Sequence, residues 1–466
     1  MVSIFPRRFI YSIYERVRNY KTTECLDELR KTQWLSGEEL KKFQWSRLEN
    51  ILRHAYKNVP FYRILFDNNA INVENDISID DFRKIPLLNR QIIDKNRETL
   101  LSKLYKPSEL TVDMTSGSTG KKLVFYKEKK RFTRSDYLNE AASLRCIEWL
   151  EFDRYDKQAF LWGSQMNNTI ITRVKNQITN FIFPTLFLSS YNLNPAMMNN
   201  YAKKIISFNP KIILGYASAL YLFANYLEEK KIKIPEINGV VSSAETLFQF
   251  QREKIEKVFQ CRVFELYGSR EFGTIAQECM AHQGLHISSE NIFVEILDEE
   301  GNPCKPGKLG KIIITDLDNY CFPFIRYDIG DIGIFSDKGC ECGRGLPLLE
   351  KVEGRTFDVI VGTNGKYFTG TFWTILFRTY VNGIEQFQVL QENNREIIIK
   401  LVVDDSFTEN EKKKLLKVIH GKCGEDMTIV IQLMDTIPLT GSGKHRFVIS
   451  KISPFLTHYQ QEDAIL

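Results

Sequence analysis

The segment from Met114 to Lys122 contains the residue types that can hold a polyphosphate. It reads MTSGSTGKK and lies inside a stretch, residues 111 to 126, that predicts strand, loop and strand. Its glycines would let the backbone come close to phosphate oxygens, its hydroxyl groups would donate hydrogen bonds, and its two lysines would supply positive charge. The alternative is a solvated Ser/Gly turn between two strands. The loop alone does not decide between these two interpretations.

The spacing of the two glycines argues against a P-loop of the Walker A type. A Walker A loop has four residues between its first glycine and the Gly-Lys-Ser/Thr that follows. Here only two residues separate Gly117 from Gly120. A P-loop kinase or ATPase is therefore disfavoured, and a different kind of phosphate-binding loop is indicated.

Five further short motifs follow the glycine loop along the chain. They read Ser243-Ala-Glu245, Tyr267-Gly-Ser-Arg-Glu271, Arg326-Tyr-Asp-Ile-Gly-Asp331, Gly354-Arg355 and Pro438-Leu-Thr-Gly-Ser-Gly-Lys444. Together with the loop they resemble, in type and order, the motifs of adenylate-forming enzymes, the superfamily of acyl-CoA synthetases, peptide-synthetase adenylation domains and luciferases. Each match is short, but the six in register extend over residues 111 to 450.

Longer segments resemble the phenylacetate–coenzyme A ligase branch and, within it, CapK-like capsule-biosynthesis proteins. These segments are NVPFYRILF, GLHISSENIFVEILDEEG, PFIRYDIGD and CECGR. The resemblance implies a multi-domain α/β fold: a large N-terminal α/β adenylate-forming domain with a β-rich subdomain, and a small mobile α+β C-terminal domain. We predict a helical first part over residues 1–110, an ATP- and acid-binding adenylation core over 111–354, and the small domain over 355–466.

The hydrophobic pattern predicts the elements that must position these motifs. Trp45, Leu48, Ile51 and Leu52 lie at helical spacing, and Asn58-Val59-Pro60 ends that helix. From residue 135 to 350 short apolar strands alternate with helical stretches, which favours α/β layers, and residues 291 to 335 are rich in strands and turns. After Gly354 we expect short strands and a charged helix that begins near Thr408, with Glu411 completing a capping box.

The resemblance implies attack of a carboxylate on the α-phosphate of ATP, with loss of pyrophosphate. This reaction needs positioning and electrostatic stabilisation of the phosphoryl oxygens. The implied catalytic residues are Lys444, Glu271 and Thr115, with Glu271 also holding Mg²⁺, which prefers oxygen ligands. The implied nucleotide-binding residues are Ser116, Gly117, Ser118, Thr119, Gly120 and Lys121 for the phosphates, Ala244, Glu245, Tyr267, Gly268 and Ser269 around the adenine, Asp331 for the ribose hydroxyls, and Arg355 at the hinge.

One position departs from the pattern of the superfamily. The small domain of these enzymes rotates about the residue that follows G-R-x, usually Asp or Lys, whereas this chain has Phe357, with Asp358 after it. An altered domain rotation therefore stays open. So do the identity of the acid and that of the acceptor, which could be coenzyme A, a carrier protein, or an amine or hydroxyl group on a sugar. The alternative function is a nucleotide-binding scaffold without turnover.

A second constellation has the composition of a metal site. Cys340 and Cys342 form a C-x-C pair, and Cys279 lies upstream with His282 and His286. Three thiolates and one imidazole would complete a tetrahedral structural zinc site with no open position for catalysis. The spacing is not that of a standard zinc finger, so free thiols are the alternative. Resemblance to ligases with a similar set favours Cys279, His286, Cys340 and Cys342 as the ligands, and His282 stays open.

The overall composition is that of a soluble globular protein, 43% hydrophobic and 26% charged. The net charge of +5 without a basic, aromatic-interleaved stripe indicates no nucleic-acid partner, and nine dispersed cysteines favour the reducing cytoplasm. The first helix, within MVSIFPRRFIYSIYERVRNY, is basic and aromatic. We expect it to pack on the body through its Phe, Ile and Tyr side chains, with at most peripheral membrane contact.

Overall fold

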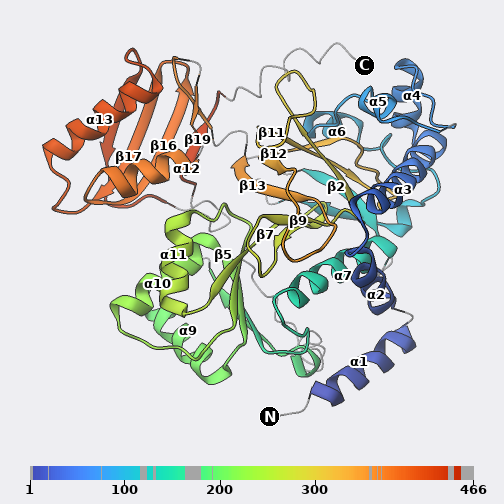
Figure 1. The fold of residues 1–466 in the computed structure, drawn as a ribbon, viewed down its shortest axis with the longest axis horizontal. Coiled ribbons are helices and arrows are strands. Elements are labelled where there is room, and N and C mark those ends of the chain that lie inside the picture. Colours follow the sequence, from blue (N-terminus) through green and yellow to red (C-terminus); the bar gives the residue numbers. More distant parts are fainter. Residues whose placement is uncertain are drawn as a thin grey trace.

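A computed structural model gives the chain a large mixed α/β domain followed by a smaller one (Figure 1). The structure describes residues 4–18, 20–74, 76–115, 123–129, 133–162, 180–190, 193–355, 359–364, 366–368, 370–438 and 446–452. The loop residues 116–122, the predicted hinge residues Phe357 and Asp358, and the segment with Lys444 lie outside these ranges.

Helices make up most of the first hundred residues, as predicted. They are α1 (Ile4–Arg18), α2 (Thr22–Thr32), α3 (Gly37–Asn58), α4 (Pro60–Asn68), α5 (Ile79–Arg83) and α6 (Arg90–Asn96). Ser36 and Glu39 form a capping box at the start of α3, and Pro60 begins the next helix because its ring cannot continue the previous one. Of the four apolar residues that predicted α3, Leu48, Ile51 and Leu52 are buried, and Trp45 is partly buried.

An eleven-stranded mixed sheet forms the centre of the large domain, in the order β10-β11-β12-β13-β9-β8-β7-β6-β5-β3-β4. Its strands are β3 (Gln158–Trp162), β4 (Thr185–Ser189), β5 (Ile212–Tyr216), β6 (Gly239–Ser243), β7 (Arg262–Ser269), β8 (Gly273–Glu278), β9 (Leu285–Ile287), β10 (Ile292–Leu297), β11 (Leu309–Asp316), β12 (Tyr327–Ser336) and β13 (Leu348–Arg355). Neighbours from β4 to β7 are parallel, and those from β7 to β10 are antiparallel. The parallel half corresponds to the predicted strand–helix alternation.

Helices and one hairpin flank this sheet. The helices are α7 (Arg134–Glu148), α9 (Pro195–Phe208), α10 (Ala217–Glu229) and α11 (Gln249–Phe259), with a 3₁₀ turn at Pro107–Glu109. The hairpin consists of β1 (Leu110–Met114) and β2 (Val124–Glu128), which pair antiparallel. It confirms the strands predicted on either side of the glycine loop.

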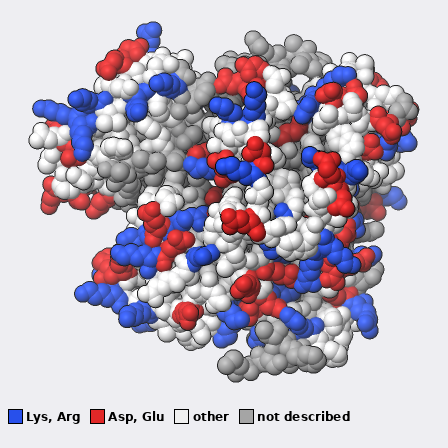
Figure 2. Space-filling view, viewed as in Figure 1, with Lys and Arg blue, Asp and Glu red and all other residues white. Residues whose placement is uncertain are grey.

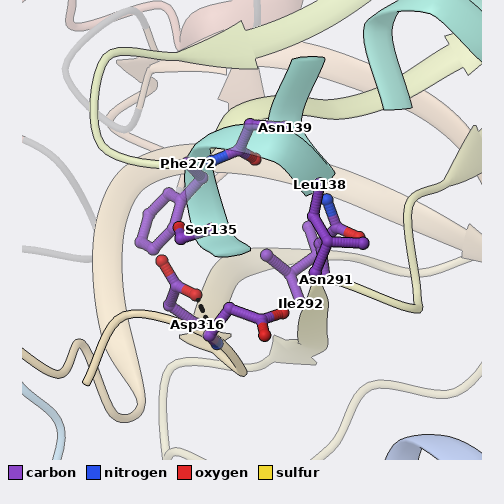
Figure 3. A pocket seen from close by; sticks show the side chains of 8 residues that line it. Ser135, Leu138, Asn139, Phe272, Asn291, Ile292 and Asp316 are labelled. Carbon is purple, nitrogen blue, oxygen red and sulfur yellow. Dashed lines mark hydrogen bonds between the residues drawn. The ribbon is translucent and has the colours of Figure 1, made fainter. Parts of the chain in front are cut away.

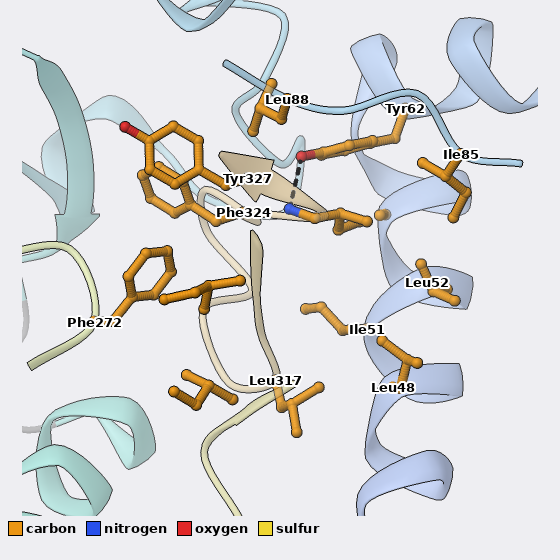
Figure 4. Close-up of a cluster of buried hydrophobic side chains, with 14 of the residues drawn as sticks. Leu48, Ile51, Leu52, Tyr62, Ile85, Leu88, Phe272, Leu317, Phe324 and Tyr327 are labelled. Carbon is orange, nitrogen blue, oxygen red and sulfur yellow. Dashed lines mark hydrogen bonds between the residues drawn. The ribbon is translucent and has the colours of Figure 1, made fainter. Parts of the chain in front are cut away.

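One apolar cluster joins α3 to the antiparallel half of the sheet (Figure 4). Leu48, Ile51 and Leu52 face Phe324 and its neighbours there. The hydroxyl of buried Tyr62 donates to the carbonyl of Pro323 at 2.8 Å and accepts from the amide of Ile325 at 3.2 Å. Because an unmade buried hydrogen bond costs about 1–3 kcal/mol, this hydroxyl firmly fixes the turn that leads into β12.

The smaller domain has its own sheet and core. It contains β14 (Ile360–Val361), β15 (Tyr367–Phe368), α12 (Gly370–Ile375), a π-helical turn at Leu376–Tyr380, β16 (Ile384–Asn393), β17 (Glu396–Val403), α13 (Glu409–Cys423), β18 (Thr428–Leu433) and β19 (Val448–Ser450). The four-stranded sheet has the order β18-β17-β16-β19. The side chain of Thr408 caps α13 as predicted. The predicted capping box is wrong, because the carboxylate of Glu411 accepts from the amide of Asn382 at 2.9 Å. The predicted boundary at 354–355 falls at the end of β13, and it stays a prediction.

Helix α1 lies at the edge of the molecule (Figure 1). Of its apolar residues, Tyr11 is buried, against Tyr155 and Phe183. The expectation that its Phe and Ile side chains pack on the body is wrong for Phe9, Ile10 and Ile13, which are exposed. No helix in the described part of the chain is both long and apolar enough to cross a bilayer.

Candidate functional site

The base of the glycine loop is closed by Thr115. Its amide donates to the carbonyl of Leu123 at 3.0 Å, and its hydroxyl oxygen accepts from the amide of Leu123 at 3.0 Å. The same oxygen accepts from Nη2 of Arg90, on α6, at 3.0 Å. Sequence reasoning missed Arg90, a cation at the base of the loop, because no local motif connects α6 with the hairpin. The other predicted loop residues, Ser116, Gly117, Ser118, Thr119, Gly120 and Lys121, lie outside the described residues.

The turn that carries Glu271 is tied to this hairpin. Asp113 of β1 accepts from Arg270 Nε at 2.9 Å and pairs with Lys127 Nζ at 3.1 Å, and Lys127 also donates to the carbonyl of Arg270 at 2.9 Å. Burial alone would raise the pKa of Asp113, but these cations and the amide of Met114 outweigh burial and lower it. The loop base and the turn are therefore held together by a charged network.

Glu271 offers a carboxylate beside the loop base. Its side chain is 7% exposed, and it forms no ion pair with any residue that the structure describes. A buried carboxylate without a cationic partner suits a magnesium ion, whose preferred ligands are oxygens. In the same turn, Gly268 must be glycine, because a Cβ there would lie 2.6 Å from the carbonyl oxygen of Gly273. The hydroxyl of Ser269 accepts from the amide of Phe272 at 3.2 Å and so closes the turn.

Tyr267 and Asp331 are in direct contact. The hydroxyl of Tyr267 donates to Oδ2 of Asp331 at 2.7 Å, across from β7 to β12. Arg355 lies opposite Asp331 in the register of β12 and β13. Three predicted nucleotide-binding residues thus lie at one place in the sheet, although Tyr267 and Asp331 are 64 positions apart in the sequence. A carboxylate oriented in this way can accept two hydroxyl groups.

The segment after β6 is strained at Ala244. This residue adopts φ = 66°, a left-handed conformation that costs a non-glycine residue on the order of 1 kcal/mol or more. The carboxylate of Glu245 accepts from the amide of Ser218 at 2.8 Å, at the first turn of α10, and Ser243 donates to the carbonyl of Leu266 at 2.9 Å. Both side chains hold the segment in place, between α10 and the end of β7.

Aromatic side chains connect the two domains. The ring of Phe447, in the small domain, lies 4.8 Å from that of Phe248 before α11 and 5.0 Å from that of Phe387 on β16. Phe250 is also near, at 6.4 Å. Lys444 lies outside the described residues, but Phe447, three positions further on, is anchored against the large domain.

The predicted zinc ligands come together. The donor atoms of Cys279, His286, Cys340 and Cys342 all lie within 4.8 Å of one another. Burial and the charge of Arg344 lower the pKa of His286 to about 4, which keeps the imidazole neutral. His282, the alternative ligand, instead stacks on Phe264 and lies 3.6 Å from the carboxylate of Glu278. Three sulfurs and one neutral imidazole fit a closed tetrahedral zinc site.

The connection between α2 and α3 supports this cluster. Oε1 of Gln33 accepts from Trp149 Nε1 at 2.7 Å and from Arg344 Nε at 3.1 Å. Trp149 in turn contacts His286 edge to face at 5.3 Å, and the amide of Gly345 donates to the carbonyl of Gln33 at 2.9 Å. Sequence reasoning missed Gln33, since a lone glutamine more than three hundred residues from its partner carries no signal.

A small polar pocket lies beside the turn that carries Glu271 (Figure 3). Its lining comprises Ser135, Leu138, Asn139, Phe272, Asn291, Ile292, Asp316 and Asp318, none of which was predicted as a site residue. The Asp316 carboxylate accepts from the amides of Asp318 at 2.9 Å and Asn319 at 3.1 Å, and burial raises its pKa to about 7. The pocket is therefore a structural polar centre beside the Glu271 turn.

Comparison with known proteins gives two kinds of match. A family model for the CapK C-terminal domain matches residues 360–451. The chain is 24% identical to Protein CapK of Staphylococcus aureus, over 97% of this chain and 96% of the relative. It is 23% identical to a phenylacetate-coenzyme A ligase of Thermus thermophilus, over 70% of this chain and 73% of that enzyme.

Solved structures share the fold. A 2-hydroxyisobutyryl-CoA ligase in its postadenylation state superposes with a TM-score of 0.72, at 15% identity, over 93% of this chain and 94% of that one. The same ligase in its thioesterification state gives a TM-score of 0.59 at 16% identity and the same coverage. The predicted fold class is confirmed.

Proposed function

We propose that this chain, which belongs to the phenylacetate–CoA ligase and CapK branch of the adenylate-forming superfamily, activates a carboxylic acid with ATP and passes the acyl group to an acceptor. The enzyme class, an AMP-forming acid ligase, agrees with this membership. The observation that carries the proposal is the hydrogen bond of 2.7 Å between Tyr267 and Asp331, with Arg355 opposite Asp331 in the sheet. This contact brings together three residues from three separate motifs, each of which is predicted to bind the same nucleotide.

In the first step, a carboxylate oxygen of the acid attacks the α-phosphorus of ATP, and the bond from that phosphorus to the bridging oxygen breaks, releasing pyrophosphate. Asp331 would accept the ribose hydroxyls while Tyr267 orients its carboxylate. The glycine loop, with Thr115 at its base, would hold the β- and γ-phosphates, and Lys444 would neutralise charge on the α-phosphate and the acid. A magnesium ion held by Glu271 would screen the charge of the departing pyrophosphate.

In the second step, a nucleophile attacks the carbonyl carbon of the acyl-adenylate, and AMP leaves. Coenzyme A is the acceptor best supported, because the ligases that resemble this chain are CoA ligases by name. A carrier protein, or an amine or hydroxyl group on a sugar, is the second possibility. The resemblance to CapK-like capsule-biosynthesis proteins favours the sugar and a role in surface polysaccharide biosynthesis, and the match to Protein CapK extends over 97% of the chain.

We also propose that Cys279, His286, Cys340 and Cys342 bind one structural zinc ion. Two observations support this proposal. The four residues offer three sulfurs and one imidazole nitrogen within 4.8 Å of one another, and no disulfide occupies the sulfurs, since all nine cysteines are free. Four protein ligands leave no position for substrate, so the metal would stabilise the fold and take no part in the reaction. A reducing cytoplasm suits this proposal because it keeps the three cysteines as thiols.

ATP–pyrophosphate exchange over a panel of aryl, fatty, amino and hydroxy acids tests the proposed activity. We expect exchange that depends on one class of acid and falls at least about a hundredfold in Lys444→Ala and Glu271→Ala. Lys413→Ala and Glu300→Ala, at exposed positions, serve as matched controls and should retain wild-type exchange. ATP binding without exchange for any acid would favour the scaffold function instead.

A further inference from the structure

Helix α1 presents an apolar face to solvent. Residues four apart lie above one another on a helix, so two adjacent rows share this face. The rows consist of Phe9, Ile13 and Val17, and of Ile10 and Tyr14, and all five side chains are exposed. Phe9 is 60% exposed and Val17 is 77% exposed, so neither side chain belongs to the hydrophobic core. Phe181, exposed and 6.0 Å from Arg7, extends the same surface.

The opposite side of α1 holds the helix to the body. Tyr11 and Glu15 are buried there, and Glu15 accepts from the amide of Thr23 at 3.1 Å. The ring of Tyr11 also contacts the guanidinium of Arg154 at 4.1 Å. The apolar face is therefore not available to the protein's own core, because the helix is already fixed with that face outward.

Arginines border the exposed face on both sides. By helical geometry, Arg16 lies next to the row of Phe9, and Arg7 lies next to Tyr14. Neither forms an ion pair with any carboxylate that the structure describes, whereas Arg8, on the body side, pairs with Asp153. Arg7 donates to the carbonyl of Tyr155 at 3.0 Å, which holds its guanidinium at the border without neutralising its charge. Basic and acidic side chains are interspersed on the face of the molecule that Figure 2 shows.

We propose that α1 docks this surface onto an anionic lipid bilayer. An amphipathic helix with aromatic and aliphatic side chains on one face and arginines along its borders lies in the plane of the membrane interface. The apolar side chains enter the acyl boundary, the exposed side chain of Arg16 reaches the phosphate groups, the charge of Arg7 adds to the attraction, and Tyr14 lies at the headgroup level. The two arginine charges make the binding selective for anionic lipids.

A second copy of the chain fits this surface less well. A symmetric contact would bring the same face of two copies together. Arg7 and Arg16 of both copies would then border one apolar seam, and like charges across an interface oppose association. A bilayer with anionic headgroups neutralises both arginines and has no such penalty.

Vesicle co-sedimentation of the full chain tests the proposal. We expect binding to phosphatidylcholine vesicles with roughly 30% phosphatidylglycerol, weak binding to phosphatidylcholine alone, and loss of binding at high salt. The double variant F9D/I13D should lose at least about tenfold in affinity, and Arg16→Glu about fivefold or more. Leu104→Asp, an exposed leucine elsewhere in the chain, is the matched control and should bind like the wild type.

Three results would overturn the proposal. They are failure of the wild type to bind anionic vesicles, equal binding to both vesicle types, and unchanged binding by F9D/I13D. Analytical ultracentrifugation of the same proteins measures whether a second copy of the chain binds this surface. A wild-type dimer that dissociates in F9D/I13D would assign the surface to a second copy. Because α1 lies outside the proposed catalytic site, ATP–pyrophosphate exchange in solution should be the same in all four proteins.

Discussion

At the scale of single residues, the hydroxyl of Tyr267 gives the site a feature that its ring alone would not. Asp331 has two carboxylate oxygens, and one of them already accepts from Tyr267 at 2.7 Å. A hydrogen bond to an ionised acceptor is shorter and stronger than one between neutral groups. Under the proposed function, the hydroxyl would fix the direction in which Asp331 meets the ribose, and Tyr267 would act as a positioning residue in addition to any stacking.

Replacement of Tyr267 by phenylalanine tests this role. The variant keeps the ring and loses only the hydrogen bond, so we expect KM for ATP to rise about three- to tenfold with little change in kcat. Asp331→Ala should cost at least about a hundredfold in kcat/KM, because the ribose ligand itself is lost. Initial rates of ATP–pyrophosphate exchange against ATP concentration measure both. An unchanged KM in Tyr267→Phe would contradict the positioning role.

Asp316 makes a pH-dependent contribution to stability. Burial raises the pKa of its carboxyl to about 7, whereas an unfolded aspartate titrates near about 4. The folded state thus disfavours the charged form, and the resulting loss of stability grows from about pH 4 to pH 7 and is complete above that. Asp316→Asn can still accept from the amides of Asp318 and Asn319. We expect its unfolding temperature, relative to wild type, to be higher at pH 8 than at pH 5; equal differences at both would contradict this.

At the scale of elements, the cysteine knuckle joins two distant parts of the large domain. Cys340 and Cys342 follow β12. Cys279 directly follows β8, and His286 lies in β9. Gln33 then connects the knuckle to the helices at the start of the chain through Trp149 and Arg344. A bound metal would stabilise this junction, because binding to a site that exists only in the folded state adds to its stability.

Metal analysis of the purified protein checks the zinc proposal. We expect about one zinc per chain, a lower unfolding temperature after chelation, and loss of the metal in Cys342→Ser. Cys261→Ser is the matched control, since Cys261 lies outside the cluster, and it should retain zinc. Full stability of the metal-free protein would show that the four residues act as free thiols.

The contact of Phe248 with Phe447 links the large domain to the small one. Aromatic pairs of this kind contribute about 0.5–1.5 kcal/mol beyond their buried area, which corresponds to a factor of about 2–10 in an equilibrium. Phe248 therefore favours the position of the small domain that this structure has, and we expect this position to serve adenylation.

Phe248→Ala should lower the rate of the adenylation half-reaction about two- to tenfold and leave the transfer of a preformed acyl-adenylate almost unchanged. Separate assays of the two half-reactions measure this. Phe187→Ala, at an exposed position on β4, is the control. An equal loss in both half-reactions would indicate a general structural defect.

At the scale of the whole molecule, local sequence patterns predicted what depends on neighbouring residues. The strands around the glycine loop, the burial of α3, the division of the sheet and the family all agree with the structure, because each rests on periodicity or on a contiguous motif. The partners of three site residues could not be predicted, because they are distant in the sequence and become neighbours only in the folded chain. These pairs are Thr115 with Arg90, His286 with Trp149, and Phe447 with Phe248. The expected packing of helix α1 was wrong for a similar reason, because its composition is the same whether its apolar face points inward or outward.

The most direct test is a single-turnover reaction with ATP labelled at the α-phosphate and the acid that supports exchange. The proposed mechanism predicts that the label passes to an acyl-adenylate and then, once the acceptor is added, to AMP, with one pyrophosphate released per adenylate. Lys444→Ala should form neither product at the wild-type rate. Label found in ADP, with inorganic phosphate in place of pyrophosphate, would contradict an AMP-forming ligase.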